Sequence, residues 1–161
     1  MALFGSRKNP VVRRRPDGRY DLVLEPGLRE AMGSLLSELD ELVSGDPGDP
    51  GLRRLAPPAY LEDPDKDAEY QLLAGDELRT ARHEAIDAVQ VSLVREQLTE
   101  AELWAWLQSL NALRLVVGTR LGIEDDDHDV RVGPDDPAAG LWSIYDFGTW
   151  IQHAVIEALD G

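Results

Sequence analysis

Cysteine is absent from the 161-residue sequence. Without thiols the chain can form neither a disulfide nor a cysteine-ligated zinc site, and it has no thiol nucleophile. Long apolar runs are absent as well: nowhere do eighteen apolar residues occur together, and no apolar segment follows the early basic residues. The sequence therefore predicts neither a signal peptide nor a membrane span, and we expect a soluble cytoplasmic protein.

Catalytic and ligand-binding motifs are also missing. The sequence has few serines and threonines, no nucleophile and base set, and no glycine-rich phosphate loop. His83, Glu84 and Asp87 approach the H-E-x-x-H zinc signature but lack its second histidine, so we interpret them as exposed helix surface. Asp125–Asp129 lacks the ligand order of a calcium loop, and we interpret it as a solvated loop. We expect no catalytic residue, no metal, no cofactor and no enzymatic activity.

Charge is unevenly distributed along the chain, whose net charge is −15. Residues 1–20 carry six basic and one acidic side chain, whereas residues 21–161 carry ten basic and thirty acidic ones. An acidic body repels nucleic acid, so any DNA contact has to come from the basic segment. The alternative is that the acidity only serves solubility. The candidate residues for contact with DNA or a partner are Arg13, Arg14, Arg15 and Arg19.

We expect a single domain over residues 1–161, because the length suffices for one hydrophobic core and no break in composition divides it. The predicted fold is mainly α-helical. It is a compact multi-helix domain around a long central helix, with a basic N-terminal β ribbon at residues 1–25 and a helical body at residues 26–160.

The ribbon is predicted to be a β-hairpin between Val11 and Leu24. Arg15-Pro16-Asp17-Gly18 supplies residues that favour a tight turn, and Tyr20 and Leu22 alternate with Asp21 and Val23 as in a strand. Because a two-stranded ribbon alone is only marginally stable, we expect it to lie on the helices.

The segment from Thr99 to Gly122 predicts the central helix. Thr99 and Glu102 have the spacing of a capping box, and Gly122 can adopt the left-handed conformation that ends a helix. Arg120 in the last turn complements the helix dipole. Apolar residues recur at helical spacing and extend beyond one face, so we expect a buried helix: Leu103, Trp104, Trp106, Leu107, Leu110, Leu113, Leu115, Val116, Val117 and Leu121.

Two further helices are predicted before the central one. The first begins at Pro26 and ends at Ser44 or Gly45, before a Gly/Asp/Pro-rich loop at residues 45–51. After one helical turn at residues 52–61, the second begins with Asp63 as N-cap and Pro64 as its first residue. A narrow alanine stripe continues the helical pattern over residues 76–97, and the sequence leaves open whether Gly75 and Asp76 break or only bend it.

A last helix is predicted from Asp136-Pro137 to Leu159, as the partner of the central helix. Gly118 and Gly148 each lie inside the apolar stripe of one of these two helices. Because glycine costs about 1 kcal/mol relative to alanine there, we expect the helices to approach closely at these positions.

Four polar residues accompany the apolar stripes: Asn111, Arg114 and Arg120 in the central helix and Asp146 in the last one. An unpaired buried charge is costly, so such groups are expected to pair. We interpret Arg114 and Asp146 as a structural ion pair that fixes the register of the two helices. The alternative is that Arg114 holds a substrate anion.

Three blocks carry a family resemblance. They are L-R-R-L-A-P-P-A-Y-L-E-D-P with the following A-E-Y (Leu52 to Tyr70), W-L-Q-S-L-N-A-L-R-L-V-V-G-T-R-L-G-I (Trp106 to Ile123) and Y-D-F-G-T-W-I-Q (Tyr145 to Gln152). Together they resemble an actinobacterial family long classified as a domain of unknown function, typified by the AosR-type oxidative-stress transcriptional regulators. The resemblance covers nearly the whole chain.

The resemblance implies a cytoplasmic regulator of transcription that contacts a protein partner such as a sigma factor or RNA polymerase. An acidic body suits a basic protein surface better than DNA. Genes of the family tend to lie near those of a protease adaptor and of sulphur carriers, so the alternative is an accessory docking protein in those pathways. A homodimer is compatible with either. Because this sequence has no cysteine, a thiol switch is not carried over.

Overall fold

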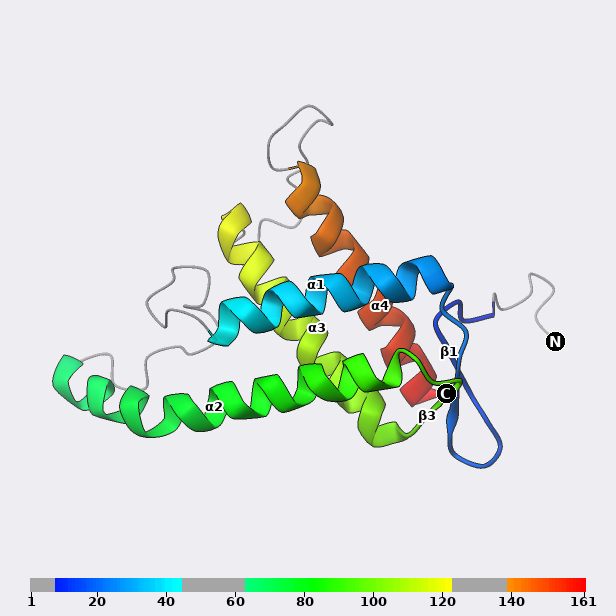
Figure 1. The fold of residues 1–161 in the computed structure, drawn as a ribbon, viewed down its shortest axis with the longest axis horizontal. Coiled ribbons are helices and arrows are strands. Elements are labelled where there is room, and N and C mark those ends of the chain that lie inside the picture. Colours follow the sequence, from blue (N-terminus) through cyan, green and yellow to red (C-terminus); the bar gives the residue numbers. More distant parts are fainter. Residues whose placement is uncertain (1–7, 45–62, 123–138) are drawn as a thin grey trace.

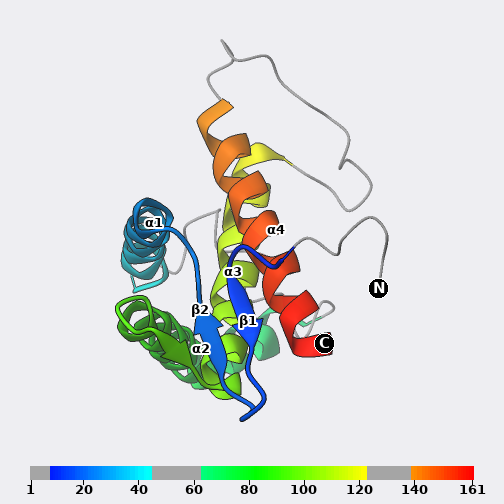
Figure 2. The ribbon, with the colours of Figure 1, turned by 90° about the vertical axis from the view of Figure 1, so that its right-hand side faces the viewer.

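The computed structural model describes residues 8–44, 63–122 and 139–161. Within them the chain forms four helices and a small sheet. The elements are β1 (Val12–Arg14), β2 (Tyr20–Leu22), α1 (Pro26–Ser44), α2 (Pro64–Ser92), β3 (Gln97–Leu98), α3 (Glu100–Leu121) and α4 (Ala139–Asp160). The helices lie in two layers, with α1 beside α2 in one and α3 beside α4 in the other (Figure 1, Figure 2). The mainly α-helical prediction is confirmed.

The sheet is antiparallel in the order β1-β2-β3 and lies at one end of the helical layers (Figure 2). The predicted hairpin is confirmed, since Val12 pairs with Leu22 and Arg14 with Tyr20. Gly18 adopts a φ of 86° in the turn, a conformation that glycine enters without steric cost. The ribbon packs on the helices as expected: Asn9 donates its side-chain amide to the Ala154 carbonyl of α4 at 2.7 Å.

The central helix α3 has the predicted ends. The Glu102 N–H donates to Thr99 Oγ1 at 3.1 Å and the Thr99 N–H donates to Glu102 Oε1 at 3.0 Å, which completes the capping box. At the other end Gly122 takes the left-handed conformation, with φ 72°. The helix packs against both α4 and α2, and the side chain of Trp106 is fully buried.

One residue of α3 departs from the prediction. Trp104 was expected to widen the buried stripe, but 55% of its surface is exposed. The neighbouring helices cover the faces of α3 that carry Leu103, Trp106 and Leu110, and the stripe alone cannot indicate which faces receive a neighbour.

Helix α1 has its predicted bounds, and α2 begins at Pro64 with Asp63 as N-cap, whose carboxylate accepts from the Lys66 N–H at 3.1 Å. Helix α2 continues past Gly75 without a break. The helical pattern predicted to reach Gln97 was wrong at its end, because α2 stops at Ser92. Gln97 instead pairs with Asp21 in the sheet.

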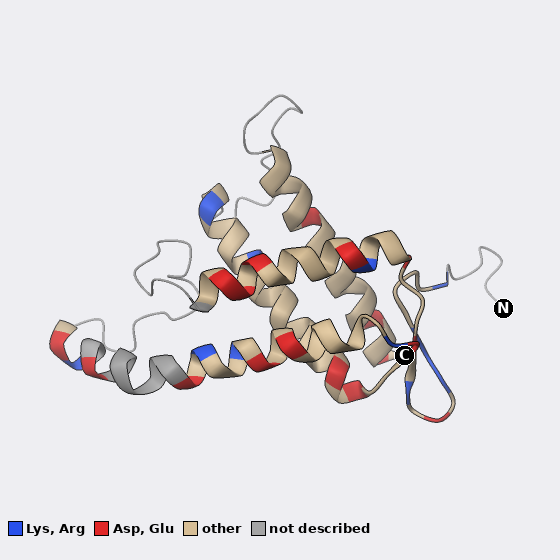
Figure 3. Cartoon of the chain, viewed as in Figure 1, with Lys and Arg blue, Asp and Glu red and all other residues tan. Residues whose placement is uncertain are grey.

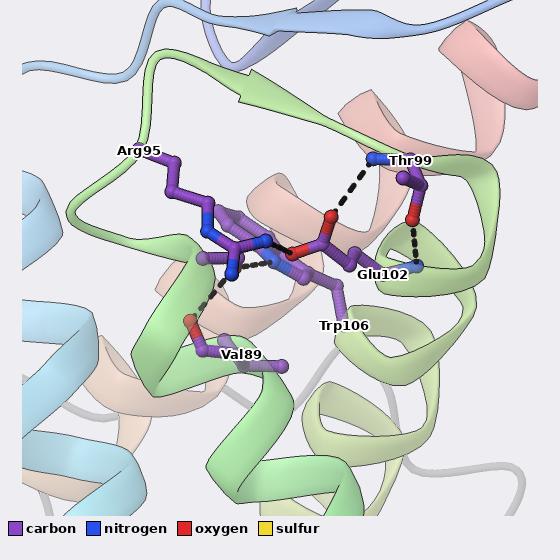
Figure 4. Close-up of polar contacts among 6 residues, drawn as sticks. Val89, Arg95, Thr99, Glu102 and Trp106 are labelled. Carbon is purple, nitrogen blue, oxygen red and sulfur yellow. Dashed lines mark hydrogen bonds and ion pairs between the residues drawn. The ribbon is translucent and has the colours of Figure 1, made fainter.

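A polar network joins the end of α2 to the start of α3 (Figure 4). The indole N–H of Trp106 donates to Ser92 Oγ at 2.8 Å, and the Ser92 hydroxyl donates to the Val89 carbonyl at 2.7 Å. Nearby, Arg95 donates to Glu102 Oε2 at 3.1 Å, so the capping glutamate also anchors the α2–α3 connection. These contacts link the end of α2 and the connection after it to the start of α3.

Arg29 of α1 ties the hairpin to the helices. Its guanidinium donates to four backbone carbonyls at 2.8 to 3.3 Å, and these belong to Leu22, Leu24, Leu93 and Arg95. The rigid fork of five N–H donors suits this geometry. One side chain therefore connects β2, the start of α1 and the end of α2.

Helices α3 and α4 form the largest helix contact among the described elements. A Cβ added at Gly148 would lie 3.3 Å from Arg114 Cγ and 3.8 Å from Leu113 Cδ2. The close approach predicted at Gly148 is confirmed, and Gly118 is buried in α3. Four sequence predictions concern segments outside the described residues: the 45–51 loop, the 52–61 turn, Asp125–Asp129 and the Asp136-Pro137 cap.

Candidate functional site

The candidate contact residues of the hairpin are held by a tight turn. The Arg15 N–H donates to the Arg19 carbonyl at 2.7 Å, and the Gly18 N–H donates to the Arg15 carbonyl at 3.1 Å. The Asp17 carboxylate accepts from the Arg19 N–H at 2.9 Å, as aspartate does in such turns. The arginines therefore extend from a defined backbone rather than from a loose arm.

Arg15 is the half-buried arginine of this group. It donates to Asp17 Oδ2 at 3.3 Å and to Asp21 Oδ1 at 3.1 Å. The hydrogen bond to Asp21, followed by that to Asp17, raises the pKa of Arg15. The Arg19 N–H, with a further contribution from Arg15, lowers the pKa of Asp17. Two carboxylates thus offset the charge of Arg15.

The side chains of Arg13, Arg14 and Arg19 are exposed. The hairpin that carries them lies beyond one end of α1 and α2, and the exposed charges of these two helices are mostly acidic (Figure 3). Arg13 also donates to the Asn9 carbonyl at 3.1 Å, which orients its guanidinium. Guanidinium groups bind carboxylates and phosphates with two parallel hydrogen bonds, so this surface can contact an acidic protein or a nucleic-acid backbone.

The polar group predicted between α3 and α4 has a different arrangement. Arg114 is half-buried and donates to Gln152 Oε1 at 2.5 Å and to the Tyr145 hydroxyl at 3.2 Å. Its guanidinium carbon also lies 5.0 Å from the centre of the Tyr145 ring, within range of a cation–π contact. The contacts found for Arg114 in the described residues thus join it to α4 through an amide and a phenol.

The other predicted members of that group lie at the surface. Asn111, Arg120 and Asp146 are all exposed. Gln152 and Tyr145 were not identified from the sequence as partners of Arg114. Their spacing to Gly148, four and three residues away, places all three on the face of α4 that meets Arg114, and this spacing is the signal that could have found them.

His83 lies at the surface of α2, as the sequence predicts. Its Nδ1 lies 2.8 Å from Asp40 Oδ1 and 3.0 Å from Asp40 Oδ2, so it bridges α2 to α1. The hydrogen bond to Asp40 raises the pKa of His83, and the charges of Asp40, Asp87 and Glu84 act in the same direction. Over the described ranges no three His, Cys, Asp or Glu side chains gather closely enough to hold a metal ion.

None of the described helices combines the length and the apolar character needed to cross a membrane.

A family model described as a domain of unknown function, DUF2017, matches residues 8–159. Among curated proteins, the chain is 30% identical over 132 residues to the oxidative stress regulator AosR of Mycobacterium tuberculosis. The same identity and length hold for the AosR protein of Mycobacterium bovis. Each alignment covers 71% of this chain and 60% of the relative.

The chain therefore spans about three fifths of the length of the curated relatives that it matches. No solved structure matches it significantly. The family model spans the basic hairpin and the four described helices, and the curated relatives are named as regulators.

Proposed function

The chain belongs to the DUF2017 family, and from this membership we propose that it is a non-enzymatic regulator of transcription acting through contact with another protein. The observation that carries the proposal is the similarity to proteins named oxidative stress regulators. We expect the partner to be a sigma factor or RNA polymerase, and the place of action to be the cytoplasm.

The distribution of charge supports contact with a protein. The hairpin, which carries three exposed arginines, lies at one end of the described helices, and acidic residues are spread over α1 and α2 (Figure 3). The net charge of −15 disfavours broad contact with nucleic acid and favours basic protein surfaces. The hairpin can add a local contact to an acidic group.

The absence of cysteine bears on how this chain could respond to oxidants. Because the sequence has no cysteine, its own thiols cannot provide a redox switch. We propose that any link to oxidative stress passes through the partner rather than through oxidation of this chain.

An affinity purification of the tagged chain from its native cytoplasm tests the proposed function. Sigma factors or polymerase subunits among the specifically bound proteins would support it. Enrichment of a protease, its adaptor or sulphur-transfer proteins instead would contradict it and favour an accessory docking role. A variant with Arg13→Ala, Arg14→Ala and Arg19→Ala, tested in parallel, shows whether the hairpin contributes to the captured contact.

A further inference from the structure

An apolar groove of about 390 Å³ lies between α1, α3 and α4. Leu35, Leu39 and Leu42 of α1 form one wall, and Leu141 and Ile144 of α4 contribute the other. The buried Val117 of α3 contributes to its lining. Four of these residues are only half-buried, namely Leu35, Leu42, Leu141 and Ile144. The packing of the described helices therefore leaves an apolar surface open between the two layers.

We propose that this groove binds the apolar face of an amphipathic helix with flanking basic residues, supplied by the protein partner. The inference rests on the proposed function, because that function requires a partner. The groove and its occupant can nevertheless be tested independently of the partner's identity.

The shape of the groove favours a helix. Leu35, Leu39 and Leu42 follow each other at four- and three-residue steps, so they form a ridge along α1. Such a ridge, facing apolar residues on two other helices, can accept the side chains of a further helix in the manner of helix-in-groove recognition. A small-molecule site would instead need polar groups converging on the ligand to orient it. Here the charged lining residues are all exposed, at the rim.

The charge at the rim favours a basic occupant. Glu38 and Glu41 are exposed on the α1 side of the groove, and Arg120 is the charged lining residue on the α3 side. The two glutamates outnumber the arginine, and the acidic remainder of the chain adds a long-range field of the same sign. Lysine or arginine residues beside the apolar face of the incoming helix would therefore meet complementary charge.

A synthetic amphipathic peptide built from leucine and lysine is the probe, and its leucine and glutamate counterpart is the control peptide. Fluorescence anisotropy with the full chain should show binding of the basic peptide and weak or no binding of the acidic one. In the variant Glu38→Lys with Glu41→Lys, the affinity for the basic peptide should fall by about tenfold. Both residues are exposed, so this variant should keep its fold.

The matched control variant is Glu30→Lys with Glu157→Lys. It changes the net charge by the same amount at two exposed positions that do not line the groove. Its affinity should change by less than about twofold. An equal loss in both variants would reduce the effect to general charge attraction and overturn the proposal.

Filling the groove provides a second test that does not depend on charge. Leu42→Trp places a larger apolar side chain at a half-buried position in the α1 wall, and it should weaken peptide binding while circular dichroism reports an unchanged helix content. Undiminished binding to this variant would overturn the proposal. Binding of a small apolar dye but of neither peptide would also overturn the proposal, because it would indicate a small-molecule site.

The same variants separate this inference from the proposed function. If affinity purification captures transcription proteins equally with wild type and with Glu38→Lys/Glu41→Lys, the groove proposal fails and the function stands. If the basic peptide binds in the groove but the purification yields no transcription protein, the groove stands and the proposed function fails.

Discussion

Trp106 donates its indole N–H to the hydroxyl of Ser92 over 2.8 Å, inside the contact between α2 and α3 (Figure 4). Both residues are fully buried, each with an exposed fraction of 0%. The Ser92 hydroxyl in turn donates to the Val89 carbonyl. This arrangement lets the largest buried side chain of the core keep its polar atom satisfied, because a single hydroxyl both accepts from the indole and donates to the helix backbone.

The first prediction concerns this hydrogen bond. Ser92→Ala should lower the free energy of unfolding by about 1 to 3 kcal/mol, because it leaves the indole N–H of Trp106 buried without an acceptor. Urea denaturation followed by circular dichroism provides the measurement. Adding Trp106→Phe should remove the penalty specific to the unpaired donor, so the two changes should not be additive. Wild-type stability in Ser92→Ala would contradict the assignment.

The second prediction concerns the contact between α3 and α4. Gly148→Leu should destabilise the protein by about 1 to 3 kcal/mol, because the new side chain would have to displace Arg114 and Leu113. Gly140→Ala is the control within α4, since an added Cβ there meets no atom within 4 Å. It should leave stability unchanged or raise it by up to about 1 kcal/mol. Thermal unfolding of both variants tests the difference in sign.

The third prediction compares Gln152, an observed partner of Arg114, with Asp146, the partner expected from the sequence. Gln152→Leu should cost about 1 to 3 kcal/mol, because it removes an acceptor from a half-buried guanidinium. Asp146→Ala should cost no more than about 1 kcal/mol, as is usual for an exposed charge. Denaturation curves of the two variants under identical conditions give the comparison. A larger loss in Asp146→Ala would restore the ion pair predicted from the sequence.

The fourth prediction concerns pH. Because the contact with Asp40 raises the folded-state pKa of His83, the protonated imidazole is favoured by folding. This contribution to stability is fully present below the unfolded-state pKa of about 6.5 and is lost as pH rises through the higher folded-state pKa. NMR titration should place the pKa of His83 above its usual value, and Asp40→Asn should lower it. An unchanged titration in Asp40→Asn would show that the pair does not hold in solution.

The fifth prediction concerns nucleic acid. Any mobility shift of duplex DNA by this chain should fall steeply with salt, because phosphate contacts made by the exposed arginines of the hairpin release counterions. Replacing Arg13, Arg14 and Arg19 with alanine should abolish the shift. The matched variant Arg15→Ala should have a smaller effect, because Asp17 and Asp21 already offset that charge. A shift that survives the triple substitution would place DNA contact elsewhere on the molecule.

The sequence was sufficient wherever the chemistry is local. The capping box of Thr99 and Glu102, the left-handed Gly122 and the turn at Gly18 were predicted, because each depends on residues within a few positions of one another. The bounds of α1 followed for the same reason. The two-residue strand β3 was missed because it is too short for a periodic pattern and exists only through its pairing with β2.

The sequence was insufficient where the outcome depends on tertiary packing. The partners of Arg114 are set by which residues of α4 lie opposite it, and Tyr145 and Gln152 have that position whereas Asp146 is exposed. Trp104 lies on a face of α3 that remains largely uncovered, which the apolar stripe alone could not indicate. The groove beside Leu35 and Leu42 is lined by residues of α1, α3 and α4, so no local motif encodes it.

The carbonyls that receive hydrogen bonds from Arg29 belong to the hairpin strand β2, to the segment between β2 and α1, and to the connection after α2. Because one guanidinium is shared in this way, the hairpin is held in a fixed position against the helices. A molecule that binds the tip of the hairpin would therefore act, through Arg29, on the connection between α2 and α3. Lysine, with three donors on one nitrogen, could not make the same set of hydrogen bonds.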